Sequence, residues 1–139
     1  MTANAAPFPL VTTIDVQWGE MDALGHVNNA RYFTWLESAR IALFQRIGVA
    51  TSGAPTIGPI LATTTCDFAR PVVFPARVEV GVRVAKVGET SIVMDYEIRD
   101  AATPSIVYAR ASSVAVLIDY RSMQKVRVPE DVREAIAAL

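Results

Sequence analysis

The segment over residues 29–48 constrains the fold most, because it is the longest stretch whose apolar residues recur with a helical period. One face follows the steps of three and four that mark one side of an α-helix, and it consists of Tyr32, Leu36, Ala39, Leu43 and Ile47. Further apolar residues widen this face beyond a single stripe: Phe33, Trp35, Ile41, Ala42 and Phe44. Glu37 and Arg40 lie beside the narrow polar band, as an ordinary i, i+3 helix pair. We therefore expect a helix that is buried on most of its sides.

Both ends of this helix carry residues that are typical of helix termini. Asn28 or Asn29 suits the N-cap, because its side-chain oxygen can accept a hydrogen bond from an otherwise unpaired backbone N–H. Gly48 suits the C-terminal end, where a left-handed backbone is common. A second, short helix is expected from Pro129 onward, with acidic residues in its first turn.

Most of the remaining chain has the patterns of β-strands. Alternating or β-branched stretches predict strands over residues 10–18, 60–70, 77–87, 91–99 and 106–120. The last of these is apolar on both faces, which is typical of a central, fully buried strand. Residues 49–59 hold two glycines and two prolines and are expected to form a loop, and residues 1–9 are expected to form a loose tail.

This order of elements predicts one α+β domain over residues 1–139, in which an antiparallel sheet wraps around one long central helix. The chain is 52% hydrophobic and 19% charged, which suits a folded domain that needs no metal or disulfide for stability. A single sheet of five strands has two exposed edges and too little cover for its outer face. We therefore expect a homo-oligomer.

Composition also limits the partners of the chain. A formal net charge of −1 argues against a broad basic surface for nucleic acid. No stretch approaches the ~20 apolar residues that span a bilayer, and the first residues lack the features of a signal peptide. Cys66 is the single cysteine, so no intrachain disulfide can form. We expect a soluble cytoplasmic protein without membrane or nucleic-acid partners.

The polar chemistry of the chain is concentrated in one stretch, GEMDALGHVNNARYF, over residues 19–33. It contains the only histidine, His26, and it lies between the first predicted strand and the long helix. The first N–H groups of a helix carry its positive end, so they can stabilise an oxyanion formed from a carbonyl. Asp22 could attack that carbonyl or activate a water, and Gly25 gives the turn access to positive φ.

The sequence pattern also allows purely structural roles for these residues. Asp and Asn are common before helices as turn formers and caps, and the turn-forming role is favoured for Asp22. Glu20 is expected to be solvated. A thiol nucleophile formed by Cys66 with His26 is conceivable, but a cysteine within a strand is usually a small core residue. One histidine and one cysteine cannot build a zinc site of the His/Cys type.

Two stretches carry a resemblance to a known family. VQWGEMDALGHVNNARYFTWLESAR resembles the signature of hot-dog fold acyl-CoA thioesterases of the 4-hydroxybenzoyl-CoA thioesterase type, and FARPVVFPARVEV is similar to the next motif of that family. The resemblance extends over residues 11–119. It implies a hot-dog fold, a curved antiparallel sheet around a central helix. It also implies dimers with a continuous sheet, often assembled into homotetramers, and active sites at the dimer interface.

The resemblance also implies roles for residues of the motif. Asp22 takes the position of the nucleophile or general base, the backbone N–H of Asn29 takes the thioester oxygen, and His26 orients water or substrate. The motif positions assigned to substrate binding are Gly25, Val27, Asn28 and Tyr32. The substrate is an acyl-CoA, so CoA enters as part of the substrate, and no metal or bound cofactor is expected. The first acid of the motif is often Asp in this family and is Glu20 here.

Two other functions remain as alternatives. One is another reaction of hot-dog proteins, the hydration or dehydration of an enoyl thioester, which also uses an acid with a histidine. The other is a non-catalytic protein that binds acyl thioesters. Release of a free thiol separates hydrolysis from both alternatives.

Overall fold

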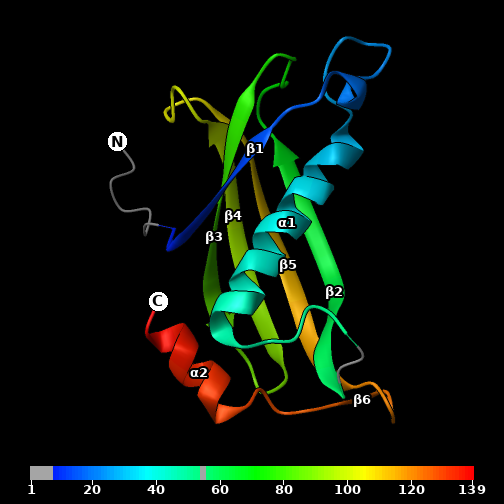
Figure 1. Ribbon diagram of the computed structural model, residues 1–139, viewed down its shortest axis with the longest axis vertical. Coiled ribbons are helices and arrows are strands. Elements are labelled where there is room, and N and C mark those ends of the chain that lie inside the picture. The colour runs from blue at the N-terminus through cyan, green and yellow to red at the C-terminus, as the bar shows by residue number, and fades with distance from the viewer. Residues whose placement is uncertain (1–7, 54–55) are drawn as a thin grey trace.

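A curved antiparallel sheet and one long helix make up the computed structural model, which describes residues 8–53 and 56–139 (Figure 1). The helix α1 (Asn29–Ile47) lies across one face of the sheet. The strands are β1 (Leu10–Asp15), β2 (Ile57–Phe68), β3 (Arg77–Val87), β4 (Ser91–Asp100), β5 (Val107–Asp119) and β6 (Gln124–Lys125). They are arranged in the order β1-β3-β4-β5-β2, and β6 pairs with β5. This is the hot-dog arrangement that the sequence predicts.

The core lies between α1 and the sheet, and the helical and strand periodicities bring its residues together. The helix contributes Tyr32, Leu36 and Leu43, which are spaced by four and seven residues on one face, and Asn28 and Gly48 cap its two ends as expected. Alternate residues of β3 and β4 point inward and are fully buried: Val78, Val80, Val82, Ile92, Met94 and Ile98. Burial of these apolar side chains is the main force that holds the helix on the sheet.

The prediction that α1 is buried on most sides is wrong for this chain. Ile41 is 39% exposed, and the side of α1 that faces away from the sheet is open. Arg40, which the sequence places beside the polar band, is instead only 8% exposed. Arg40 follows Tyr32 and Leu36 at steps of four residues, so it shares their inward-facing row.

Several strand boundaries also differ from the sequence prediction. β1 ends at Asp15, and residues Trp18–Glu20 form a short 3₁₀ helix instead of continuing the strand. β2 begins at Ile57, inside the predicted loop, and β6 was not predicted. β5 is an internal strand as expected, but only one of its faces is buried and the other is half-buried.

The start of the described chain is attached to the sheet. Residues 1–7 of the predicted tail lie outside the described residues, but Phe8 packs on β3, over Gly81. A Cβ atom at Gly81 would lie 2.6 Å from Cγ of Phe8, so this position accommodates only glycine while Phe8 stays in place. The guanidinium of Arg83 also lies over the Phe8 ring, 5.1 Å from its centre.

The second helix, α2 (Glu130–Ala137), packs at the end of the sheet that is opposite to the 19–33 motif (Figure 1). Its Arg133 donates to the carbonyl oxygens of Gly88 and Glu89, in the turn between β3 and β4. None of the helices in the described ranges 8–53 and 56–139 is long and apolar enough to cross a membrane.

Candidate functional site

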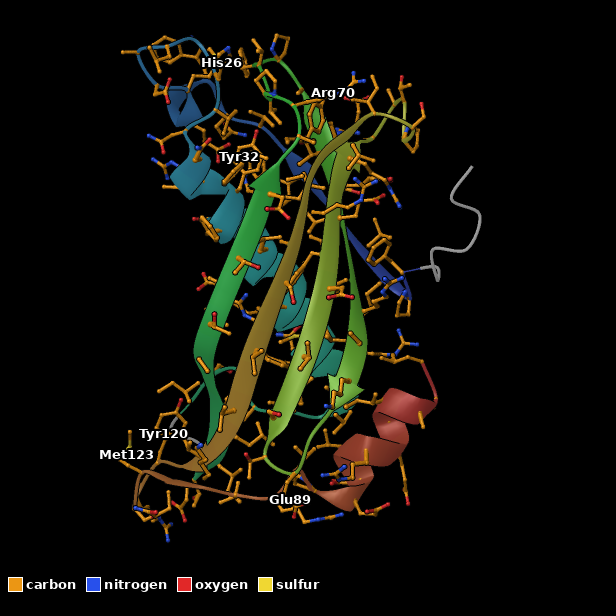
Figure 2. The ribbon with its side chains drawn as sticks, turned by 180° about the vertical axis from the view of Figure 1, so that it is seen from behind. His26, Tyr32, Arg70, Glu89, Tyr120 and Met123 are labelled. Atoms are coloured by element: carbon orange, nitrogen blue, oxygen red, sulfur yellow. The ribbon has the colours of Figure 1, made fainter. Side chains whose placement is uncertain are left out.

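The 19–33 motif forms a tight loop at one end of the molecule, where His26, Arg70 and Tyr32 lie (Figure 2). Met21 and Val27 form an isolated antiparallel bridge that closes this loop. Inside it, the N–H of Asp22 donates to the carbonyl of His26 at 2.8 Å. Gly25 has a φ of 84°, which is the left-handed conformation that its position in the turn requires.

Asp22 is exposed, and one of its oxygens holds the loop in shape. Its Oδ1 accepts a hydrogen bond from the N–H of Leu24 at 2.9 Å, which is an Asx turn. Within the described part of the chain, no donor lies within hydrogen-bond distance of Oδ2. Asp22 is therefore a turn former, as the simpler interpretation predicts, and it still has an oxygen open for chemistry.

The amide groups at the start of α1 lie next to this loop. Oδ1 of Asn28 accepts from the N–H of Ala30 at 2.9 Å, and the carbonyl of Asn28 accepts from the N–H of Arg31. The N–H of Asn29 has no hydrogen-bond acceptor among the residues that the structure describes. It is thus a backbone donor at the positive end of a 19-residue helix, where a developing negative charge is stabilised.

Glu20 connects the loop to the helix, so the prediction that its side chain is solvated is wrong. Its Oε1 accepts from the N–H of Gln17 at 2.8 Å, and its Oε2 accepts from the indole N–H of Trp35 at 3.0 Å. In addition, the carbonyl of Glu20 accepts from the N–H of Asn28. Both the side chain and the backbone of Glu20 therefore fix the loop relative to α1.

Val27 and Tyr32, which the sequence assigns to substrate binding, are both buried, with 2% exposure each. The N–H of Val27 donates to the carbonyl of Val72 at 2.8 Å. The hydroxyl of Tyr32 accepts from the N–H of Val72 at 3.2 Å, and burial raises the pKa of this hydroxyl. Both residues anchor the segment around Val72 to the motif, and they present no open side-chain surface in this chain.

The role of Val72 was not identified from the sequence. The residue lies in FARPVVFPARVEV, the second stretch that carried the family resemblance. Its backbone N–H and C=O contact both sides of the 19–33 motif, so the only sequence signal for its role was its presence in that stretch. His26 is exposed, and its carbonyl, not its ring, takes part in the hydrogen bonds of the loop.

Three adjoining cavities extend along α1, and two of them lie between α1 and β2. The first, of about 330 Å³, lies at the helix start and is lined by Asn28, Arg31 and Thr34 among others, but not by Asp22. It shares Thr34 with a second cavity of about 200 Å³. The second shares Glu37, Arg40 and Leu61 with the largest, of about 580 Å³. We call this row of cavities the α1 groove; Phe33 and Phe44 of α1 and Thr64 of β2 also line it.

Cys66 does not have the properties of a catalytic thiolate. It lies in β2 and packs against the core, and burial, with a smaller contribution from the neighbouring Asp67 carboxylate, raises its pKa to about 11. A thiol with this pKa stays protonated at neutral pH. Among residues 8–53 and 56–139, no group of three or more His, Cys, Asp or Glu side chains is arranged to hold a metal ion.

Comparisons with known proteins agree with the fold and the motif. Residues 16–136 match the family model described as the thioesterase-like superfamily. The solved structure of the PA2801 protein of Pseudomonas aeruginosa is 33% identical in sequence, with a TM-score of 0.84, and the match covers 91% of this chain and 96% of that one. A thioesterase from Thermus thermophilus, complexed with coenzyme A and Zn, is 30% identical with a TM-score of 0.80, covering 95% and 94%.

A curated relative is more distant. The protein YsmA of Bacillus subtilis is 27% identical over 89 residues, which is 64% of this chain. The matched stretch spans 60% of the length of YsmA.

Proposed function

Because the chain belongs to the thioesterase-like superfamily, we propose that it hydrolyses acyl-CoA thioesters to a free carboxylic acid and coenzyme A. One observation carries the proposal: among the residues that the structure describes, the exposed carboxylate of Asp22 lies in the hydrogen-bonded loop that leads directly into α1, where the N–H of Asn29 is unpaired. The solved thioesterase with bound coenzyme A supports CoA as the carrier of the acyl group.

In the proposed reaction, the thioester carbonyl oxygen accepts a hydrogen bond from the N–H of Asn29. This bond stabilises the negative charge that develops on the oxygen. Asp22 either attacks the carbonyl carbon or takes a proton from a water molecule that attacks it. The C–S bond of the resulting tetrahedral adduct breaks, and the electron pair leaves with the CoA thiolate. On the first route this step leaves a mixed anhydride with Asp22, which water then hydrolyses to the free acid and the Asp22 carboxylate. His26 orients water or substrate. Loss of one oxyanion donor in other enzymes lowers the rate ~10²–10³-fold, which sets the scale for the amide of Asn29.

We also propose that two copies join into a dimer with a continuous sheet and that dimers assemble into a homotetramer. β2 lies at a free edge of the sheet, and its exposed apolar residues include Ile57, Ile60 and Leu61. Such an edge is suited to pair with another strand. The site would then lie at the interface, and the protein would act in the cytoplasm without a metal or bound cofactor.

The proposal is tested by measuring release of free thiol from a panel of acyl-CoAs. Asp22→Asn keeps the oxygen that accepts from Leu24 but removes the charge, so we expect activity to fall by roughly 10²–10⁴-fold. Asp119→Asn is the matched control, because Asp119 accepts from the N–H of Arg121 in the same i, i+2 geometry at the opposite end of the molecule. This variant should retain wild-type activity.

Three outcomes would contradict the proposal. A wild-type protein that releases no thiol from any thioester is not a thioesterase. Loss of the enoyl chromophore without release of thiol would indicate a hydratase. Tight binding of acyl-CoA without turnover, in both the wild type and Asp22→Asn, would indicate a binding protein.

A further inference from the structure

Arg40 is a buried cation whose charge is not paired within the described residues. Its side chain is only 8% exposed, and one of its nitrogens, Nη1, donates to the hydroxyl of Tyr96 at 3.3 Å. That hydroxyl is in turn shared with the hydroxyl of Ser113. In the part of the chain that the structure describes, no carboxylate lies within 4.0 Å of Arg40, and the pair with Glu37 that the sequence predicts does not form. A buried charge without a counter-ion is strongly unfavourable, so an anion at this point would be stabilised.

The unpaired guanidinium lines a groove and is not enclosed by the core. Arg40 contributes to two adjoining cavities of the α1 groove, including the one of about 580 Å³. The wall of the larger cavity is mainly apolar and includes Phe44 and Leu61, and Phe33 lines the smaller one. A charged group beside apolar walls is the pattern of a site for a ligand with an apolar body and a polar end.

A second polar group faces the same place without a partner among the described residues. Oγ1 of Thr64 is buried and has no hydrogen-bond partner among the described residues. Thr64 lines the smaller of the two cavities that Arg40 also lines. Buried hydroxyl groups in folded proteins nearly always have a partner. Thr64 pairs with Ser113 across β2 and β5, which places the hydroxyl next to the network of Arg40. The guanidinium of Arg40 and the hydroxyl of Thr64 could therefore bind the same polar end of one ligand.

Glu37 is the only acidic residue among the described residues that line these two cavities, and it is exposed. Water weakens the electrostatic field of the exposed Glu37 carboxylate, whereas the guanidinium of Arg40 is largely excluded from water. The buried part of the groove is thus positive although its rim carries one negative charge. This arrangement favours a carboxylate that enters along the apolar wall and reaches Arg40.

We propose that the α1 groove binds acyl groups whose far end carries a carboxylate, and that Arg40 and Thr64 recognise this carboxylate. The inference rests on the proposed function, because it places the thioester at the N–H of Asn29 and the acyl chain along α1. Asn29 and Arg40 are eleven residues apart on the helix, or ~16 Å along its axis. Helical side chains point toward the N-terminus, so the guanidinium of Arg40 lies closer to the N–H of Asn29 than this axial distance. An extended acyl chain of roughly ten carbons would bridge the two groups.

The test compares two thioesters that differ only at the far end of the acyl chain: the mono-CoA thioester of decanedioic acid and decanoyl-CoA. The measured quantity is the ratio of their kcat/KM values from release of free thiol. The wild type is expected to prefer the substrate with the carboxylate. Arg40→Met should lower the ratio about tenfold or more, because it removes a hydrogen bond between charged groups. Arg40→Lys, which keeps the charge but loses the planar fork, should give an intermediate ratio.

Thr64→Val gives the same test without removing the contact between Arg40 and Tyr96. Since the hydroxyl of Thr64 has no partner among the described residues, its loss should not destabilise the fold, and the ratio should fall several-fold. Thr65→Val is the matched control. Thr65 lies on the opposite face of β2 and lines a separate cavity with Arg110, so the ratio should equal that of the wild type.

A binding measurement separates failure of this inference from failure of the proposed function. Calorimetric titration with monomethyl decanedioate and dimethyl decanedioate needs no catalysis. In both compounds one methyl ester stands for the thioester, and the far end is a carboxylate in the first compound and a second ester in the other. The monomethyl ester should bind the wild type about tenfold more tightly, and Arg40→Met should remove the difference. Equal affinities, or equal kcat/KM ratios in the wild type, Arg40→Met and Thr64→Val, would overturn the inference. Absence of thiol release together with preferential binding would overturn only the proposed function.

Discussion

The carboxylate of Glu20 accepts the indole N–H of Trp35 at 3.0 Å and so joins the 19–33 loop to the second turn of α1. A shorter aspartate would not span the same distance while also accepting the N–H of Gln17, as Glu20 does. The glutamate at a motif position that is often aspartate in the family thus has a structural reason. The orientation of the loop relative to the amide of Asn29 depends on it.

Replacing Glu20 with alanine should therefore destabilise the protein. The buried indole N–H of Trp35 would lose its acceptor, at a cost of about 1–3 kcal/mol in the free energy of unfolding. Activity should fall as well, because the loop would no longer be fixed on the helix. Urea unfolding and thiol release measure the two effects. Glu134→Ala, at an exposed position of α2, is the control, and equal stability of the two variants would contradict the prediction.

The cap of α1 offers a second prediction. Asn28→Ala removes the side-chain acceptor of the N–H of Ala30, which should lower the free energy of unfolding by about 1 kcal/mol. It should also lower kcat, because the same cap orients the neighbouring amide of Asn29. Asn28→Ser keeps a capping oxygen and should restore most of both quantities. If thermal unfolding and kinetics show no difference between the alanine and serine variants, the cap does not support the site.

Gly25 allows a test of backbone conformation alone. A Cβ atom at this position would meet nothing within 4 Å, so the cost of Gly25→Ala comes only from its φ of 84°. We expect a loss of about 1–2 kcal/mol in the free energy of unfolding, together with a lower kcat. Gly19→Ala is a matched control, since it has the same open surroundings without the positive φ. Equal unfolding midpoints for the two variants would show that the loop is not held in the conformation described.

The thiol of Cys66 should react slowly with alkylating reagents at neutral pH. Burial raises its pKa to about 11, so it is protonated below that pH, and the reactive thiolate appears only as the pH rises toward this value. The rate of reaction with iodoacetamide should thus increase steadily between about pH 7 and pH 10. A plateau below about pH 9, measured on the folded protein, would contradict the assigned environment.

Periodicity predicted the main elements because it reports directly on burial. The step pattern of Tyr32, Leu36 and Leu43 gave α1, and strict alternation gave β3 and β4. The motif also indicated the loop and the helix cap, since Asn28 and Gly25 are residue types that these backbone conformations require. The residues alone made Asp22 and the first N–H groups of α1 candidates for acyl transfer, but the family resemblance assigned the roles to Asp22 and Asn29, and these roles stay predictions.

What the sequence did not reveal depends on contacts between distant residues. Pro59 indicated a loop, but it lies in β2, which is an edge strand, and edges tolerate a residue without an N–H. The contacts of Val72 with Val27 and Tyr32 join segments about 40 residues apart. Burial of Arg40 could have been suspected from its steps of four after Tyr32 and Leu36, but its charge outweighed that signal.

The position of β2 has a consequence for how the chain reaches this structure. β2 pairs only with β5 among the described strands, and the partner of Ile57 is Asp119, so the strand is synthesised long before its neighbour exists. During that interval the backbone groups of β2 have no strand to pair with among the described strands that precede β5 along the chain, and an unpaired strand edge is prone to associate with other chains. Folding yield should therefore respond more to growth temperature and chaperone supply than the stability of the finished protein would suggest.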